Sequence, residues 1–339
     1  MTIEQTDVGR ILVIKLRAIG DVLLSTAVLR NLRVAFPDAS IDFLTEVPSR
    51  EVLEGNPDVS SLLIFDGKKQ SGAGLILDVR RRRYDLVIDL FGNPRSALVT
   101  LFSGAKYRVG YRFGWRRYCY NIVVHPRGGE VHNVEFNLDA LRSIDVPVHS
   151  AEPIFPLSTQ SESFAEDYFR KSGLAGKHVV AFNPGGGWYT KRWRISHFAR
   201  LGERLVNQFN VRVIVVWGPG ERDDAEQVIK LGNFGGEIIP PTSLKQLASI
   251  LKRCSAIVTN DSGPMHIAAA MGIPVVAIFG PTRPELQGPL AGNFEVVRHQ
   301  ELSCLGCNLT KCPIGNPCME DLSVEHVFEA FKRVMERAG

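Results

Sequence analysis

Short apolar runs alternate with longer amphipathic stretches along the whole chain. Runs rich in Val, Ile, Leu and Phe lie at residues 10–16, 40–45, 61–65, 85–90, 177–182, 211–217, 256–259, 275–279 and 294–297. Uninterrupted apolar runs of this length predict strands that are buried on both faces, and the stretches between them have helical spacing. Strands that alternate with helices form parallel sheets covered by helices on both sides. The pattern therefore predicts an α/β fold with doubly wound sheets.

A stretch punctuated by proline, residues 146–156, interrupts this alternation. It follows a predicted helix near 133–143, and the strand pattern restarts after it, so we interpret it as a linker. The predicted organisation is an N-terminal Rossmann-like domain over 1–155, a second Rossmann-like domain over 156–320 and a final helix within 321–339. The final helix has its apolar residues on one face. We expect it to pack back on the first domain, as such helices often do in two-domain folds of this kind.

The composition fits two globular domains and narrows the range of partners. The 339 residues are 45% hydrophobic, which is enough for two cores. The formal net charge of +4 is small for this length and gives no general case for nucleic-acid binding. No apolar run reaches the roughly 18 residues of a membrane span, and the N-terminus does not resemble a signal peptide. We expect a cytoplasmic protein.

Polar and small residues follow the strand predicted at 256–259. Ser262 can cap a helix that begins at Gly263, and Pro264 fits the first turn because its missing N–H costs nothing there. Free amides and the positive end of the helix dipole favour a phosphate or diphosphate. A simple strand–helix–strand crossover with a capped helix would explain the same residues without a ligand. We favour a ligand site because Asp261 and His266 converge with them at the carboxyl end of a parallel strand.

A second phosphate-type loop follows the strand predicted at 177–182. Gly185 and Gly186 belong to a run of three glycines whose backbone could cradle a phosphate, and Lys191 or Arg192 could neutralise its charge. A glycine-rich loop alone is a weak signal, and the chain matches neither the P-loop pattern nor the dinucleotide fingerprint.

Two further polar residues end strands of the second domain. Glu221 follows the strand at 211–217 and could accept hydrogen bonds from a ribose or base, or merely start the next helix. Thr282 closes the strand at 275–279 and could place its hydroxyl on a phosphate or ribose. Both positions lie at predicted carboxyl ends, where open α/β sheets bind ligands.

Asp21 follows the first predicted strand, at the start of a helix. An N-cap or first-turn carboxylate is a common use of Asp, and spacing alone does not separate that role from catalysis.

Basic residues interleaved with aromatic ones mark the segment 106–118. Guanidinium groups beside aromatic rings suit a phosphorylated sugar or an anionic lipid head group, and single-stranded nucleic acid fits this architecture less well. The basic candidates for binding such a group are Arg108, Arg112, Arg116 and Arg117. Asn93 and Arg95, after the strand at 85–90, could touch the same bound group or only form a turn. The run 80–83, four arginines, is typical of a solvated helix face.

Four of the six cysteines gather near the end of the chain, at Cys304, Cys307, Cys312 and Cys318. Four sulfurs could form a tetrahedral structural zinc site, but spacings of two, four and five residues match no standard zinc ribbon. Reduced cysteines or two local disulfides are the alternatives. A catalytic metal is not expected.

Three segments resemble glycosyltransferase family nine, the lipopolysaccharide heptosyltransferases. The segment 15–26 is similar to the opening motif of that family, and 256–282 is similar to its donor-site segment. In 183–193 the chain resembles the family pattern of Pro-Gly-Ala, a spacer and Lys-x-Trp, with Gly186 where Ala is more usual.

The resemblance implies the GT-B architecture, two Rossmann-like domains that face a cleft. It implies inverting transfer of a sugar from a nucleotide diphosphate, ADP-heptose, to a lipopolysaccharide core acceptor at the inner face of the cytoplasmic membrane. Asp21 would be the base. Lys191, with the amides near Gly263 and His266, would stabilise the departing diphosphate, so no catalytic metal would be required.

Two other functions stay open at this point. A sugar-nucleotide epimerase or hydrolase would have the same architecture and would turn over the donor without an acceptor. A non-catalytic nucleotide-sugar or lipopolysaccharide-binding module would bind the donor without any turnover.

Overall fold

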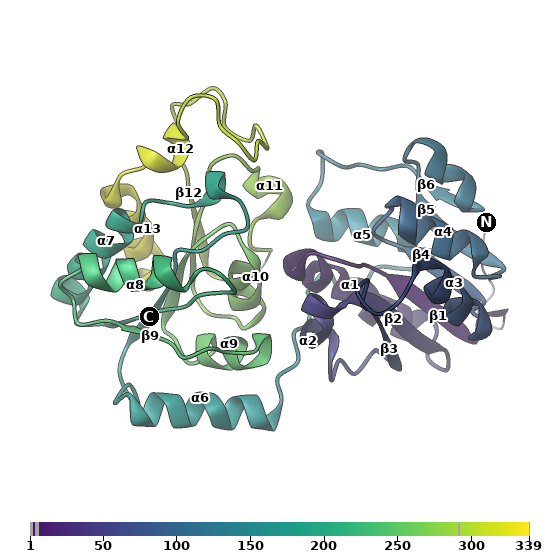
Figure 1. The fold of residues 1–339 in the computed structure, drawn as a ribbon, viewed down its shortest axis with the longest axis horizontal. Coiled ribbons are helices and arrows are strands. Elements are labelled where there is room, and N and C mark those ends of the chain that lie inside the picture. Colours follow the sequence, from purple (N-terminus) through teal and green to yellow (C-terminus); the bar gives the residue numbers. More distant parts are fainter. Residues whose placement is uncertain (1–2, 4–6, 291, 339) are drawn as a thin grey trace. The chain divides into compact units, whose positions relative to one another are not determined.

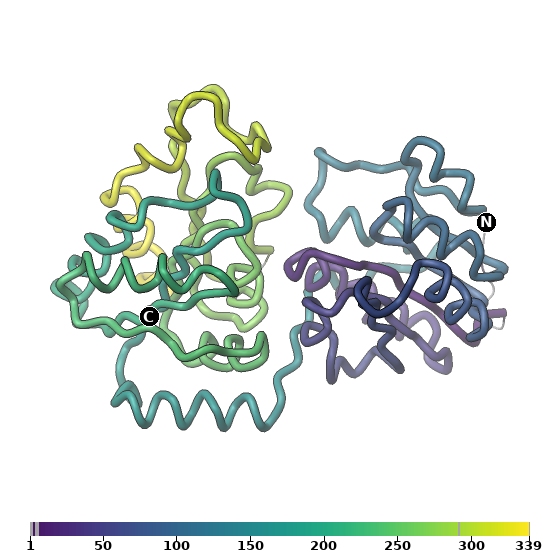
Figure 2. Tube along the Cα trace, in the orientation of Figure 1, coloured from purple at the N-terminus to yellow at the C-terminus, as the bar shows by residue number. Residues whose placement is uncertain are grey.

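The computed structural model describes residues 3, 7–290 and 292–338. Its contacts divide the chain into two compact units, Met1–Pro156 and Leu157–Gly339 (Figure 1). The boundary expected from the proline-punctuated stretch lies one residue earlier. The chain passes once from the first unit to the second, as its trace shows (Figure 2).

The first unit contains a six-stranded parallel sheet in the order β3-β2-β1-β4-β5-β6. Its strands are β1 (Arg10–Ile14), β2 (Ser40–Glu46), β3 (Ser61–Phe65), β4 (Leu86–Asp89), β5 (Tyr107–Tyr111) and β6 (Ile122–Val124). Its α-helices are α1 (Ile19–Ala35), α2 (Arg50–Leu53), α3 (Gly72–Arg81), α4 (Pro94–Phe102) and α5 (Asn133–Arg142), and its 3₁₀ helices are η2 (Val47–Ser49) and η3 (Gly114–Cys119).

The helices of the first unit form two layers, one on each face of the sheet. Leu12 of β1 shares a buried cluster with Leu75 of α3 and Val99 of α4. Helix α4 also packs against η3, whereas α1 packs against α2 and α5. Because successive residues of a strand point to opposite faces, α3, α4 and η3 cover one face, and α1, α2 and α5 cover the other.

The second unit repeats the architecture with the order β12-β11-β10-β7-β8-β9, again with parallel pairing. Its strands are β7 (Val179–Asn183), β8 (Arg212–Val215), β9 (Glu237–Ile238), β10 (Ala256–Asn260), β11 (Val275–Ile278) and β12 (Phe294–Val297). Its helices are α6 (Thr159–Lys171), the 3₁₀ helix η4 (Tyr189–Lys191), α7 (Ile195–Phe209), α8 (Arg222–Leu231), α9 (Leu244–Leu251), α10 (Gly263–Ala270), α11 (Pro284–Gln287), α12 (Pro317–Glu320) and α13 (Val324–Glu336).

The final helix, α13, packs on the second unit. Its apolar residues Val327, Phe328 and Phe331 belong to the same buried cluster as Val276 of β11 and Leu201 of α7. Figure 1 shows α13 beside α7 and β12. This placement differs from the expected return onto the first domain, because the apolar stripe of α13 is already buried against its own unit.

Strands β5 and β6 lie where the apolar pattern marked no strand. Tyr107, Val109 and Tyr111 of β5 are buried, and Arg108 between them is half-buried. Tyrosine and arginine obscure the apolar run, although aromatic residues favour strands. The segment 106–118, with its basic and aromatic residues, is therefore partly a sheet strand and only partly a surface.

Candidate functional site

Both candidate phosphate loops leave the carboxyl ends of neighbouring strands. In the register of the second sheet, Thr259 of β10 pairs with Asn183, the last residue of β7. The loop 184–187, which contains the three glycines, follows β7, and α10 begins three residues after β10 ends. The two segments therefore start at the same edge of the sheet, as the sequence predicts.

Asn260 fastens the glycine loop to β10. Its Nδ2 donates to the main-chain oxygens of Pro184 at 2.8 Å and Gly185 at 3.1 Å, and its Oδ1 accepts from the Trp193 amide at 3.1 Å. The side chain is fully buried. Asn260 is not among the site residues predicted from the sequence, because an Asn after a strand is equally typical of the beginning of a turn.

Ser262 occupies the N-cap position of α10 but does not cap the helix with its side chain. Its Oγ accepts from Asn183 Nδ2 at 2.7 Å and donates to the Asn260 main-chain oxygen at 3.1 Å. The expected side-chain cap is therefore wrong, since the Asn183 amide holds the hydroxyl. His266, on the first turn of α10, is buried.

Lys191 meets Asp261 and Thr282 beside the start of α10. The Lys191 Nζ lies 2.7 Å from Asp261 Oδ2, and Thr282 Oγ1 donates to the same oxygen at 2.6 Å. Lys191 and Asp261 are 14% and 5% exposed, and the ammonium lies over the Trp188 ring, 4.6 Å from its centroid. Three segments distant in the sequence thus bring a nearly buried cation to the positive end of a helix, where anions are stabilised.

Glu221 holds the glycine loop through its carboxylate. Its Oε1 accepts from the Gly186 amide at 2.8 Å and its Oε2 from the Gly218 amide at 3.0 Å. Arg192 binds the same region, with its Nε donating to the Gly186 oxygen at 2.9 Å and its Nη1 to Asp224 Oδ2 at 2.8 Å. Through these contacts Glu221 and Arg192 shape the glycine loop.

The two glycines of this loop differ in the space around them. A Cβ added to Gly185 would lie 2.2 Å from Glu221 Oε2, which no real contact allows. A Cβ added to Gly186 would meet Arg192 Cγ at 3.6 Å, an ordinary contact. The alanine more usual at position 186 therefore fits this backbone, whereas a side chain at position 185 would displace the Glu221 carboxylate.

In the first unit, Asp21 is the third residue of α1, near the carboxyl end of β1. Its Oδ2 accepts from the Ala18 amide at 3.3 Å, and the residue is half-buried. The first-turn role weighed from the sequence is thus present, and the position leaves part of the carboxylate exposed.

Two other ionisable residues of the first unit, Lys15 and Asp89, are buried. Lys15, the residue after β1, donates from Nζ to the Leu90 oxygen at 3.0 Å. Asp89, fully buried, accepts from the Gly92 amide at 2.9 Å and from the Tyr120 hydroxyl at 2.8 Å. Burial raises the pKa of Asp89 against the effect of these hydrogen bonds. Burial lowers the pKa of Lys15, while the charges of Asp21 and Asp89 oppose that shift.

The predicted acceptor arginines have different surroundings. Arg108 links two backbone segments, because its guanidinium donates to the main-chain oxygens of Ala105 at 2.9 Å and Cys119 at 3.3 Å. Arg116 lies over the Phe113 ring and Arg117 over the Tyr118 ring, and Arg112 is exposed just after β5.

Asn93 and Arg95 flank the start of α4. Asn93 Oδ1 accepts from the Ser96 amide at 2.8 Å and so caps the helix, in agreement with the turn that the sequence left open. Arg95 lies over the Phe65 ring and 3.6 Å from Glu46 Oε1.

The four clustered cysteines do not form the zinc site considered from the sequence. All are free thiols, so the two local disulfides are absent as well. Within residues 3, 7–290 and 292–338, no group of three or more His, Cys, Asp or Glu side chains is arranged to hold a metal. Burial raises the pKa of Cys318 to about 11, which disfavours the thiolate that binds metals.

The segment with these cysteines instead contacts the loop after β11 and the 3₁₀ helix η4 through its backbone. The Asn308 amide donates to the Pro281 oxygen at 2.6 Å, and Thr190 Oγ1 donates to the Leu309 oxygen at 2.8 Å.

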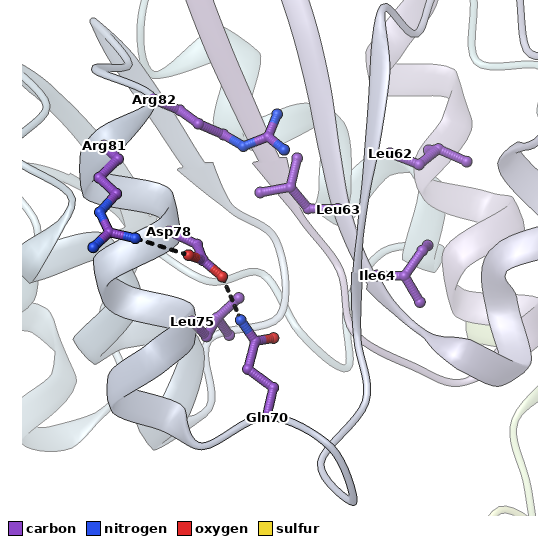
Figure 3. A pocket seen from close by; sticks show the side chains of 8 residues that line it. All are labelled: Leu62, Leu63, Ile64, Gln70, Leu75, Asp78, Arg81 and Arg82. Atoms are coloured by element: carbon purple, nitrogen blue, oxygen red, sulfur yellow. Dashed lines mark hydrogen bonds and ion pairs between the residues drawn. The ribbon is translucent and has the colours of Figure 1, made fainter.

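One cavity, of about 500 Å³, lies between the edge strand β3 and α3 (Figure 3). It is lined by Leu62, Leu63, Ile64, Gln70, Leu75, Asp78, Arg81 and Arg82. Asp78 accepts from Gln70 Nε2 at 2.5 Å and lies 3.8 Å from Arg81. The predicted site residues do not line this cavity.

Two doubly wound sheets in one chain, with a glycine loop, a helix start and a nearly buried lysine at one carboxyl edge, fit the GT-B architecture. A model of the family described as Glycosyltransferase family 9 (heptosyltransferase) matches residues 74–316. The chain belongs to this family. An epimerase, a hydrolase or a non-catalytic binding module is therefore not favoured.

Individual relatives agree with this assignment. Lipopolysaccharide heptosyltransferase 2 of Escherichia coli strain K12 is 30% identical over 313 residues, which cover 85% of this chain and 88% of that protein. The glycosyltransferase family 9 structure from Veillonella parvula DSM 2008 aligns with a TM-score of 0.87 at 23% identity, covering 98% and 99% of the two chains. The structure of E. coli ADP-heptose LPS heptosyltransferase II aligns at 0.79 and 25% identity, covering 97% and 99%.

Proposed function

We propose that this glycosyltransferase transfers heptose from ADP-heptose to a lipopolysaccharide core acceptor, with inversion at the anomeric carbon. The observation that carries the proposal is the Lys191–Asp261 pair beside the start of α10 and the glycine loop, an arrangement that suits a diphosphate. Family membership supports the reaction class, and the names of the relatives support the sugar and the acceptor.

We assign the donor diphosphate to the second unit. The ammonium of Lys191 has three N–H donors, and the bond to Asp261 uses one, so two can reach phosphate oxygens. The ion pair also holds the ammonium in place, which reduces the entropy lost on binding. The remaining donor contacts are assigned to Gly185, Gly186, Arg192, Glu221, Ser262, Gly263, His266 and Thr282.

The reaction is a single displacement. The acceptor hydroxyl oxygen bonds to the anomeric carbon while the bond from that carbon to the phosphate oxygen breaks, and the electron pair leaves with ADP. Asp21 takes the hydroxyl proton. Lys191 and the start of α10 stabilise the negative charge that grows on the diphosphate, so protein groups supply the charge neutralisation.

We assign the anionic acceptor to the first unit, through Asn93, Arg95, Arg108, Arg112, Arg116 and Arg117. Guanidinium groups bind phosphate and carboxylate oxygens in pairs, which suits a charged sugar core. The acceptor is attached to lipid, so the enzyme would work as a peripheral protein at the cytoplasmic face of the inner membrane. Within the described residues, no helix is long and apolar enough to cross a bilayer.

The test is a transfer assay joined to a binding measurement. The protein is incubated with ADP-heptose and a heptose-deficient lipopolysaccharide, and mass spectrometry records the mass of one added heptose. ADP binding is measured by calorimetry for the parent, Lys191→Ala and Lys191→Arg. We expect Lys191→Ala to weaken binding by at least about 1.5 kcal/mol, the scale of a charge-assisted hydrogen bond, and Lys191→Arg to lose less.

Equal ADP affinity in the parent and Lys191→Ala would refute the assignment of Lys191. Release of free heptose without any acceptor product would point instead to a hydrolase.

A further inference from the structure

Basic residues are concentrated in one helical layer of the first unit, the layer of α3, α4 and η3. Residues 71–83 and 90–120, which comprise this layer and strand β5 with its flanking residues, contain ten of the 40 Lys and Arg residues and one of the 36 Asp and Glu residues. The rest of the chain therefore contains 30 basic and 35 acidic residues, although the whole carries only +4. The small net charge hides a strong local asymmetry.

Carboxylates neutralise only part of this charge. Among the described residues, the ion pairs of the layer are Arg81–Asp78, Arg82–Asp42, Arg95–Glu46 and Lys106–Asp7. Of the other six basic residues, Arg108 binds main-chain oxygens, while Arg116 and Arg117 lie over aromatic rings. Carbonyl groups and rings cancel no charge, so the layer keeps a positive surplus.

The outward rows of the same helices also carry exposed apolar residues. Leu98 and Phe102 lie one turn apart on α4, and Leu77 lies on the outward row of α3; all three are exposed. Trp115 and Tyr118 of η3 are 52% and 70% exposed. We call this surface the α3–η3 face.

Contacts between the helices make the face continuous. Arg80, in the last turn of α3, donates to the Phe102 oxygen at 3.3 Å. Ala97 of α4 shares a small buried cluster with Cys119, the last residue of η3. The inner sides of α3 and α4 are fixed on the sheet, so their exposed leucines and Phe102 are a surface and not an unfinished core.

We infer that the α3–η3 face docks on an anionic lipid bilayer, an inference that rests on the proposed lipid-linked acceptor. Tryptophan and tyrosine suit the head-group region, leucine and phenylalanine suit the acyl boundary, and arginine suits lipid phosphates. Each signal alone anchors a protein weakly, whereas an apolar patch together with basic residues gives stable but reversible binding.

A bilayer fits this face better than a nucleic acid does. A nucleic acid would use the arginines but would leave Leu77 and Leu98 exposed to water. The apolar residues lie among the basic ones, on the same helices, so one flat surface that offers both phosphate and hydrocarbon matches them together.

The experiment measures sedimentation with vesicles, with neither donor nor acceptor present. One set of vesicles is phosphatidylcholine alone and the other contains phosphatidylglycerol. The face variants are Leu98→Ser/Phe102→Ser and Arg81→Glu/Arg83→Glu. Their controls are exposed residues of the second unit, Leu231→Ser/Ile314→Ser and Arg170→Glu/Lys171→Glu. Arg170 pairs with Asp167 three residues earlier, as Arg81 pairs with Asp78, so the charge controls are matched.

We expect the parent to bind the anionic vesicles, each face variant to lose about tenfold or more in partitioning, and both controls to behave like the parent. Raising the salt should weaken parent binding. Parent-like binding by the face variants, equal losses in the controls, or equal binding of the parent to both vesicle sets would overturn the inference. The inference would also be overturned if a short single-stranded oligonucleotide displaced the parent from vesicles while a phosphatidylglycerol micelle did not.

A second measurement separates this inference from the proposed function. Transfer of heptose to a delipidated, water-soluble core acceptor should be unchanged in the face variants. If vesicle binding fails while soluble transfer continues, the docking surface is wrong and the enzyme assignment stands. If vesicle binding depends on the face but no transfer occurs with any acceptor, the enzyme assignment is wrong and the docking surface stands.

Discussion

The carboxyl edges of the two sheets carry different kinds of polar groups. At the edge of the second sheet, the neutral amide side chains of Asn183 and Asn260 hold the ends of the strands and their loops, and ion pairs join Lys191 to Asp261 and Arg192 to Glu221 and Asp224. At the edge of the first sheet, the ionisable groups Lys15 and Asp89 are themselves buried.

This difference corresponds to what each edge must do in the proposed reaction. A diphosphate needs backbone amides and a cation held still, and neutral amides can hold loops without adding competing charge. A base needs a carboxylate whose surroundings are fixed, and the buried side chains of Lys15 and Asp89 are held in place by hydrogen bonds. The second edge is therefore suited to binding, and the first to the handling of a proton.

Substitution of Asp21 should separate the proposed roles of the two edges most clearly. Asp21→Asn keeps the size of the side chain and much of its hydrogen bond to the Ala18 amide, so the fold should survive. Turnover should fall by on the order of 10²–10⁴, the usual effect of removing a positioned base, while ADP affinity changes little. Steady-state kinetics at saturating substrates and calorimetry measure the two quantities. Near-normal turnover would return Asp21 to the role of a first-turn carboxylate.

Substitution of Asn260 tests whether neutral side-chain amides hold the loops at the carboxyl edge of the second sheet. Asn260→Ala leaves the oxygens of Pro184 and Gly185 and the amide of Trp193 without this buried partner. We expect a loss of about 2–3 kcal/mol in the free energy of unfolding, measured by urea titration. The KM for the donor should rise more than kcat falls, because the loop and not the base is disturbed. A larger effect on kcat would move Asn260 nearer to the chemistry.

Gly185 and Gly186 offer a matched pair of substitutions in the loop after β7. Gly185→Ala forces the Glu221 carboxylate from its bonds, and we expect a cost of about 1–2 kcal/mol and about tenfold weaker donor binding. Gly186→Ala adds the same methyl group in ordinary contact distance and should bind donor like the parent. Thermal unfolding and calorimetry compare the two variants. Equal behaviour would show that Glu221 adapts and does not fix the loop.

Much of the fold follows from the sequence because buried parallel strands leave plain apolar runs. The runs at 10–16, 85–90 and 256–259 all became central strands. Strand β5 was not predicted because Tyr107, Arg108 and Tyr111 interrupt the apolar pattern. The packing of α13 on its own unit was not predicted because an apolar stripe on a helix does not identify the surface that will bury it.

The site was predicted in part for similar reasons. Residues after strands, such as Asp261 and Thr282, lie where topology places them, so the sequence could bring them together. The roles of Asn260 and Glu221 depend on loop geometry across 35 residues or more of sequence, which spacing does not encode. The clustering of four cysteines suggested a metal, although their spacing matched no standard zinc ribbon, and packing decides that one thiol is buried and two others are exposed.

The smallest expected effect concerns the buried carboxylate of the first edge. Burial raises the folded-state pKa of Asp89 above its unfolded value. Its contribution to stability is therefore fully present below the unfolded pKa and is lost as the pH rises through the folded pKa. Asp89→Asn does not titrate, and its Oδ1 can accept from the Phe91 and Gly92 amides as the carboxylate does.

Consequently, the parent should gain stability relative to Asp89→Asn as the pH falls from 7 toward 4. Urea unfolding of both proteins at four or five pH values in that range measures the difference, with Asp85→Asn as a partly exposed carboxylate control. A difference that does not change with pH would mean that the hydrogen bonds from Gly92 and Tyr120 cancel the effect of burial. The first edge would then resemble the second, with polar groups held at no net electrostatic cost.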